Sequence, residues 1–211
     1  MMTTFKEFVM SSVNLKESTL FDSSSLFKEM ALLNPHAINK TQAAMQFIHQ
    51  YKIPGAIIGG IAVANYVCDR PLTPDVDFLT SDLHQLKIIL SSQNMNFQPL
   101  ASSGDFGGVY VPELDADFLD ANEGNSRLNH YVLQTATQAQ IGGMSFPIIN
   151  PEVLTIMKFI IGRDKDQTDA FKLLPVINKA ALKVHLKALQ KYLPQDMDAR
   201  TIWSYAQALS A

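Results

Sequence analysis

The chain has 211 residues, of which 47% are hydrophobic and 18% charged, so it can bury a sizeable core and is not an intrinsically disordered protein. Its 17 basic and 20 acidic residues give a formal net charge of −3, which excludes a whole-protein positive field for DNA or a membrane surface. The single cysteine, Cys68, cannot form an internal disulfide, and Met1–Ser12 lack a signal-peptide pattern. We therefore expect a cytoplasmic protein without disulfides.

The first part of the chain predicts two helices, a short strand and a third helix. Asp22 and the serines after it resemble a helix cap, and Asn34-Pro35 ends the first helix. In chain order we expect helices over residues 22–33 and 40–51, a strand over 56–58 and a helix over 61–67. The turn Gly59-Gly60 joins the strand to the third helix, whose first amides would point beyond the strand end. Prolines and glycines interrupt the apolar stretch Ile53–Cys68, so we expect no membrane span.

The middle of the chain predicts strands and the remainder predicts helices. From Thr73 an alternating strand places Asp75 and Asp77 on one face, and Asp82 caps a helix over 83–90. Short strands then follow over 97–100, 108–111, 114–119, 131–135 and 144–149. From Pro151 the apolar spacing is helical, and three further helical runs follow the first one.

These elements predict the fold class and the division of the chain. We expect an α/β (α+β) protein with a mixed β-sheet flanked by helices and an α-helical C-terminal region. Residues 1–150 would form the α/β core with its N-terminal helices, and residues 151–211 would form helices packed on that core. No linker is visible in the sequence, so one compact unit is expected.

Acidic residues within apolar strands are the strongest chemical signal. A carboxylate in a buried strand costs several kcal/mol unless it is paired or binds a cation, and Mg²⁺ prefers carboxylates, water and phosphates. Asp75 and Asp77 share one strand face, and a later strand carries Asp115, Asp117 and Asp120. The alternative is that these are surface acids on a half-exposed strand.

A longer motif changes the balance between these two readings. The residues that form it are Gly59, Gly60, Ala62, Arg70, Thr73, Asp75 and Asp77. This block resembles the minimal nucleotidyltransferase family, and specifically its AbiEii-like and antitoxin-like branch. The family's third carboxylate lies on a neighbouring strand, where Asp117 fits the pattern best and Asp115 is the alternative.

A second block extends the resemblance toward the C-terminus. The AbiEii-like branch has a helix in which a lysine is followed by an arginine and by a Lys-Asp-x-x-Asp pattern, as in Lys158, Arg163 and Asp166 to Asp169 here. On a single continuous helix Lys158, Asp166 and Asp169 would lie on one face and offer a cation and two acids. The alternative is a solvated lysine and an acidic run at a frayed helix end.

The resemblance implies a Mg²⁺-dependent transfer of a nucleoside monophosphate from a nucleoside triphosphate to a hydroxyl. In it Asp75 and Asp77 would hold Mg²⁺ on the triphosphate, and Asp117 would help a second ion to activate the acceptor. The nucleotide-binding residues that it implies are Gly59, Gly60, Arg70, Thr73, Lys158, Arg163 and Asp166. Arg70 could equally be the structural partner of a nearby acid.

The acceptor and the biological role stay open at this level. The resemblance implies a tRNA, a partner protein or a small molecule as acceptor, and a toxin–antitoxin system as a setting. The alternative from another class is a nucleotide-binding or partner-binding protein that keeps the fold without turnover. A metal-dependent phosphohydrolase would use similar carboxylates but lacks support from the Gly59-Gly60 turn.

Overall fold

The computed structural model describes residues 35–67, 75–100, 107–141 and 143–209. The predicted helix over 22–33 therefore lies outside the described residues, as do Cys68, Arg70 and Thr73. The strands are β1 (Gly55–Ile57), β2 (Val76–Thr80), β3 (Gln98–Pro99), β4 (Gly108–Val111), β5 (Ala116–Asp120), β6 (Thr137–Ile141) and β7 (Met144–Ile148). The helices are α3 (Pro35–Tyr51), α4 (Gly59–Tyr66), α5 (Leu83–Ser92), α6 (Ser126–Thr135), α7 (Pro151–Ile161), α8 (Asp164–Leu173), α9 (Lys179–Leu189) and α10 (Ala199–Ala208), with a 3₁₀ turn over Gln190–Tyr192.

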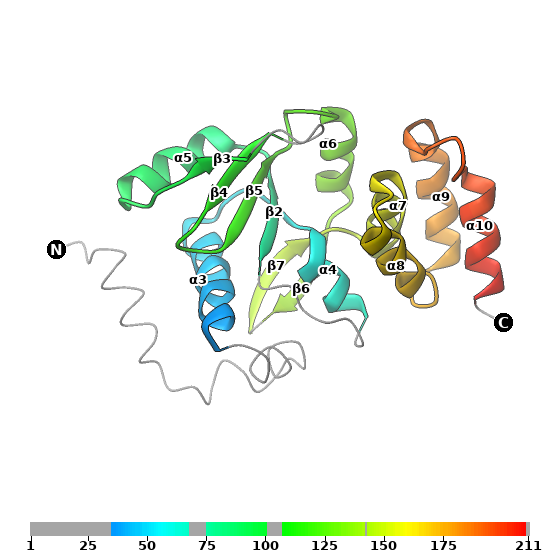
Figure 1. Ribbon diagram of the computed structural model, residues 1–211, viewed down its shortest axis with the longest axis horizontal. Coiled ribbons are helices and arrows are strands. Elements are labelled where there is room, and N and C mark those ends of the chain that lie inside the picture. The colour runs from blue at the N-terminus through cyan, green and yellow to red at the C-terminus, as the bar shows by residue number, and fades with distance from the viewer. Residues whose placement is uncertain (1–34, 68–74, 101–106, 142, 210–211) are drawn as a thin grey trace.

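The strands form one mixed sheet in the order β3-β4-β5-β2-β1-β7-β6. Two pairs are parallel, β2 with β5 and β1 with β7, and the other neighbours are antiparallel. Helices α3 and α5 lie on one side of the sheet, and α4, α6 and α7 lie on the other (Figure 1). The predicted mixed α/β fold class is confirmed.

The alternation of β2 and β5 separates a hydrophobic face from an acidic one. Phe78 and Phe118 are fully buried and pack edge to face, and Phe118 also meets Phe47 of α3. Because successive strand residues point to opposite faces, Asp77 and Asp117 project from the other side of the sheet. Burial of the phenylalanines therefore fixes which face carries the acids.

One predicted element has the wrong type. The chain over 131–135 was expected to be a strand, but it is the second half of α6. Asn125 caps this helix, and Leu128 and Val132 are buried with the i, i+4 spacing of a helix. The strand next to β7 is instead β6, in which only Ile141 is fully buried, so its alternation is too weak to predict a strand.

The C-terminal helices share their core with the sheet. A single cluster of buried hydrophobic side chains extends from α3 through the sheet and α7 to Ile202 and Ala206 of α10. The hydroxyl of Tyr131 on α6 lies 2.8 Å from Nδ1 of His185 on α9. The three helical runs predicted after α7 are confirmed. Within the described residues, none of the helices is both long and apolar enough to cross a membrane.

Candidate functional site

A cavity of about 330 Å³ lies between the acidic face of the sheet and helices α4, α6 and α7. Its charged part contains the predicted acids and three cationic residues. Its apolar part comes from the sheet and from α6 and α7. The lining residues are Ile58, Gly59, Gly60, Asp75, Asp77, Leu79, Leu100, Asp117, Leu119, Asn129, Val132, Ile149, Leu154, Met157, Lys158, Ile161, Arg163 and Lys165.

Three carboxylates meet at this cavity because two parallel strands run side by side. Asp77 of β2 and Asp117 of β5 are register partners, and neighbouring strands lie about 4.8 Å apart. Asp75 precedes β2 by one residue and lines the same cavity. The long-range pairing of β2 with β5 thus brings together acids that are far apart in the sequence.

Asp115 is placed differently from Asp117. It lies in the turn before β5 with a φ of +50°, and its carboxylate accepts a hydrogen bond of 2.8 Å from the Tyr110 hydroxyl. Asp117 is one of the described residues that line the cavity, and Asp115 is not. Of the two alternatives for the third carboxylate, the geometry therefore favours Asp117.

Burial and the charges of neighbouring acids both act on Asp77 and Asp117. The pKa of Asp77 is raised to about 6, first by burial and then by the charge of Asp75, with a smaller contribution from Asp117. The Gly60 amide and Lys158 act in the opposite direction and lower this pKa. Burial also raises the pKa of Asp117, and the charges of its acidic neighbours add to this effect. A cation or a proton would relieve this repulsion.

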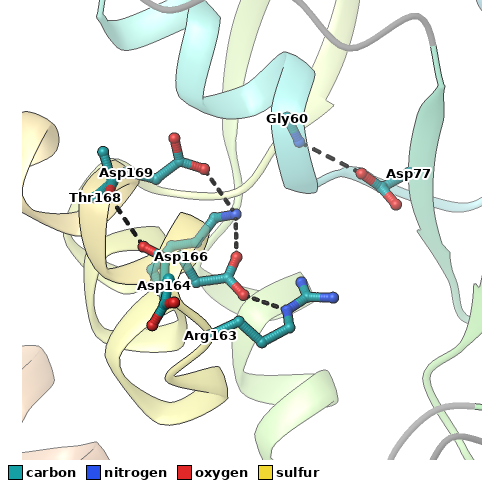
Figure 2. Close-up of polar contacts among 8 residues, drawn as sticks. Gly60, Asp77, Arg163, Asp164, Asp166, Thr168 and Asp169 are labelled. Carbon is teal, nitrogen blue, oxygen red and sulfur yellow. Dashed lines mark hydrogen bonds and ion pairs between the residues drawn. The ribbon is translucent and has the colours of Figure 1, made fainter.

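The glycine turn before α4 is shaped around Asp77. Gly59 has a φ of +62°, and a Cβ added there would lie 1.8 Å from Asp77 Oδ2. The amide of Gly60, in the first turn of α4, donates a hydrogen bond of 3.4 Å to the same carboxylate oxygen (Figure 2). Both the positive φ and the close approach require glycine at residue 59. The predicted helix therefore begins two residues earlier than expected, at Gly59.

The second predicted block is a helical hairpin and not one continuous helix. Gly162 adopts a φ of +72° and ends α7, and α8 then begins at Asp164. The expectation that Lys158 and the two acids share one helix face is therefore wrong. The ammonium of Lys158 on α7 lies 2.7 Å from Asp166 Oδ1 and 3.0 Å from Asp169 Oδ2 across the hairpin.

This buried ion cluster joins α7 to α8 beside the cavity. Lys158, Asp166 and Asp169 are all buried, so the alternative of a solvated lysine at a frayed helix end is also wrong. Arg163 donates from Nε to the other oxygen of Asp166, and its side chain is 60% exposed (Figure 2). Burial raises the pKa of Asp166, but its bonds to Arg163 and Lys158 hold that pKa below the ordinary value overall.

Sequence reasoning missed two polar residues of the cavity. Lys165 lines the cavity from the start of α8. It belongs to the Lys-Asp pattern of the second block, which by itself assigns this lysine no role. Asn129 lines the cavity from α6 and is fully buried. No signal in the sequence pointed to Asn129, because the segment just after it was interpreted as a strand.

The donor set at the cavity suits a hard divalent cation. Three carboxylates, two of them with raised pKa values, are the oxygen ligands that Mg²⁺ prefers. Among the described residues, however, no three His, Cys, Asp or Glu side chains are gathered as a metal-binding group. The chemistry of Asp75, Asp77 and Asp117 and the sheet face that they share are therefore suitable for binding Mg²⁺. Their carboxylates would have to turn toward one ion to bind it.

Comparisons with known proteins bear on the fold. No protein-family model matches the chain, and no curated protein matches it. The chain is similar in structure to the antibiotic-resistance factor ANT(2″)-Ia, with 14% identity, 74% of this chain and 90% of that chain covered and a TM-score of 0.51.

Two further structures give lower TM-scores. For an antigenic nucleotidyltransferase-like protein from Paracoccidioides brasiliensis the values are 19% identity, 80% and 92% coverage of this chain and that one, and a TM-score of 0.49. The lincomycin-bound lincosamide antibiotic adenylyltransferase LnuA has 13% identity and a TM-score of 0.45, with 65% of this chain and 96% of that chain covered. At these identities the likeness concerns the fold alone, and the chain shares its mixed α/β fold with ANT(2″)-Ia.

Proposed function

We propose that the protein transfers a nucleoside monophosphate from a nucleoside triphosphate to a hydroxyl group of an acceptor. The observation that carries this proposal is that Asp75, Asp77 and Asp117 line one cavity together with the Gly59-Gly60 turn. Acids with raised pKa values beside a helix N-terminus form a site for a cation and phosphate together. The nucleotidyltransferase-like fold is consistent with this chemistry.

Each group at the cavity has a role in this proposal. Asp75, Asp77 and Asp117 would hold Mg²⁺, which when bound neutralises phosphate charge and lowers the pKa of a bound hydroxyl. The N-terminus of α4 would face the phosphate oxygens, and its Gly60 amide, which donates to Asp77 in this structure, would exchange that carboxylate for a phosphate oxygen.

The cationic side of the cavity also has a role. Arg163, fixed by Asp166 and largely exposed, would counter phosphate charge at the cavity rim. Lys158 would act from a distance, because its ammonium is already in contact with two acids.

The acceptor, the AbiEii-like branch and a toxin–antitoxin role stay proposals that rest on the sequence motifs. A tRNA end, a tyrosine of a partner protein and a small molecule each bring the hydroxyl that the reaction needs. Arg70 and Thr73, the two remaining nucleotide-binding candidates, lie outside the described residues.

One observation supports a second candidate function. The described carboxylates are not gathered as a metal-binding group, so the protein could bind a nucleotide or a partner without turnover. In that case a triphosphate would bind, but the acceptor hydroxyl would not be activated. The two candidates therefore differ in transfer of the nucleotide and agree in its binding.

Calorimetric titration of the four nucleoside triphosphates with Mg²⁺ tests the shared part of both candidates. We expect Mg²⁺-dependent binding to the wild type that is lost in Asp77→Asn and Asp117→Asn. Asp115→Asn is the matched control, because asparagine tolerates the positive φ at this position and the side chain lies outside the cavity lining. No binding of any triphosphate at millimolar concentration would refute the proposal.

Transfer of the α-phosphate label from the preferred triphosphate separates the two candidates. Label that becomes attached to an RNA, a protein or a small-molecule fraction in the wild type, and not in Asp117→Asn, supports catalysis. Mg²⁺-dependent binding without transfer to any of these three fractions would favour the binding protein.

A further inference from the structure

A buried amide in the cavity wall has an unused hydrogen-bond acceptor. Asn129 is fully buried in α6 and lines the cavity. Its Nδ2 donates a hydrogen bond of 3.0 Å to the backbone oxygen of Glu123. Its Oδ1 is the one buried side-chain polar atom of the described residues without a hydrogen-bond partner. A buried acceptor left without a partner is costly, so its position in a cavity wall indicates where a ligand group belongs.

The chain itself determines which atom of the amide is left over. The Glu123 backbone oxygen can only accept a hydrogen bond, so the NH₂ group of Asn129 must face it. A flipped amide would place two acceptors against each other. The atom that remains is therefore a carbonyl oxygen, and a ligand that satisfies it must bring an N–H or O–H donor.

The surroundings of Asn129 are apolar. Leu79 and Leu119 lie one strand alternation beyond Asp77 and Asp117 on the same face of the sheet, and both line the cavity. Val132 follows Asn129 by three residues on the same face of α6 and also lines the cavity. The cavity thus has a charged half at the acids and an apolar half with one carbonyl acceptor.

A nucleoside triphosphate has the same division into a charged part and a flat, largely apolar ring with polar edge groups. We propose that the apolar half of the cavity holds the nucleobase and that Asn129 Oδ1 accepts a hydrogen bond from its exocyclic amine. This inference rests on the proposed function, because the charged half would hold the triphosphate. It deepens that function by assigning selectivity: adenine, guanine and cytosine carry such an amine and uracil does not.

Binding of matched nucleotides tests the inference without knowledge of the acceptor. The tightest of the four triphosphates is compared by calorimetry with its analogue that lacks the amine. The analogues are purine riboside triphosphate for ATP, inosine triphosphate for GTP and 2-pyrimidinone riboside triphosphate for CTP. We expect loss of the amine to weaken binding to the wild type about 10- to 100-fold, as for a buried acceptor left without its donor.

Two variants separate recognition of the amine from general packing. Asn129→Leu keeps the approximate size of the side chain and removes the acceptor, so the amine-bearing nucleotide and its analogue should bind equally within about twofold. Val132→Ala removes apolar contact from the same helix face, so it should weaken both nucleotides together and preserve their ratio. Thermal unfolding of both variants shows that they are folded before binding is compared.

The possible results distinguish this inference from the proposed function. Tightest binding of UTP, equal binding of the two matched nucleotides to the wild type, or an unchanged ratio in Asn129→Leu would each overturn the role of Asn129. The proposed function would survive all three results if Mg²⁺-dependent binding is still lost in Asp77→Asn. Absence of triphosphate binding to the wild type would overturn both.

Discussion

Replacement of Asp77 by asparagine should stabilise the metal-free protein at neutral pH. The pKa of Asp77 is raised from its ordinary value of 3.8 to about 6, mainly by burial and by the charge of Asp75. Because the folded pKa lies above the unfolded one, the stabilising contribution of this group is complete below about pH 3.8 and is lost as the pH rises through about 6. Asparagine stays neutral over this range and does not lose this contribution.

The magnitude follows from the shift of the pKa. One pKa unit corresponds to about 1.4 kcal/mol, so the full shift would correspond to about 3 kcal/mol. Asp77 is half-buried beside a cavity, so water in the cavity screens part of this, and we expect about 1 to 2 kcal/mol. The shift of Asp117 has the same direction, whereas the lowered pKa of Asp166 affects stability only below about pH 4.

Urea unfolding with EDTA present, at pH 4.0 and pH 7.5, measures this effect. The free energy of unfolding of Asp77→Asn minus that of the wild type should increase by about 1 to 2 kcal/mol between the two pH values. Asp164→Asn removes an exposed acid from the first turn of α8 and controls for the change in net charge. A difference between Asp77→Asn and the wild type that is the same at both pH values, or that decreases toward pH 7.5, would refute the reasoning.

Two other substitutions test the architecture of the site. Gly59→Ala should cost more than about 2 kcal/mol of unfolding free energy, because its Cβ would meet Asp77 Oδ2 and the φ is positive. Gly143 also has a positive φ, but a Cβ added there would meet no atom within 4 Å, so Gly143→Ala should cost only about 1 kcal/mol. Equal costs for the two substitutions would contradict the contact between the Cβ at residue 59 and Asp77. Lys158→Met should cost about 3 to 5 kcal/mol of unfolding free energy, because it removes the buried ammonium between Asp166 and Asp169. The control Lys187→Met, on the exposed face of α9, should change stability by less than about 0.5 kcal/mol. A loss below about 1 kcal/mol in urea unfolding of Lys158→Met would show that the cluster does not join the hairpin.

Much of the site could be predicted because its signals are local. The alternation that exposes Asp75 and Asp77 on one strand face needs only a period of two along the chain. The Gly59-Gly60 turn is visible because few other residues adopt its backbone conformation. The helical spacing after Pro151 likewise needs no distant contact to be recognised.

The failures have physical causes of two kinds. The segment that forms the second half of α6 contains β-branched and aromatic residues that favour strands, and packing of Leu128 and Val132 decides for the helix. At Gly162 a helical pattern continues on both sides, so the periodicity alone does not show that α7 ends there. In α6 a tertiary contact overrides a local preference, and at Gly162 the left-handed backbone of one glycine interrupts a periodic pattern.

The sequence by itself therefore determined which side chains are suited to the chemistry: acids on a strand face, a glycine turn and a cationic segment after it. Only the tertiary structure decided how they are combined. The pairing of β2 with β5 brought Asp117 beside Asp77, and the break at Gly162 turned Lys158 toward Asp166 and Asp169. The fold of α6 buried Asn129 in the same cavity. The pairing of β2 with β5 and the placement of α6 depend on contacts between distant parts of the chain, and the turn at Gly162 depends on a single backbone conformation, and local periodicity specifies neither.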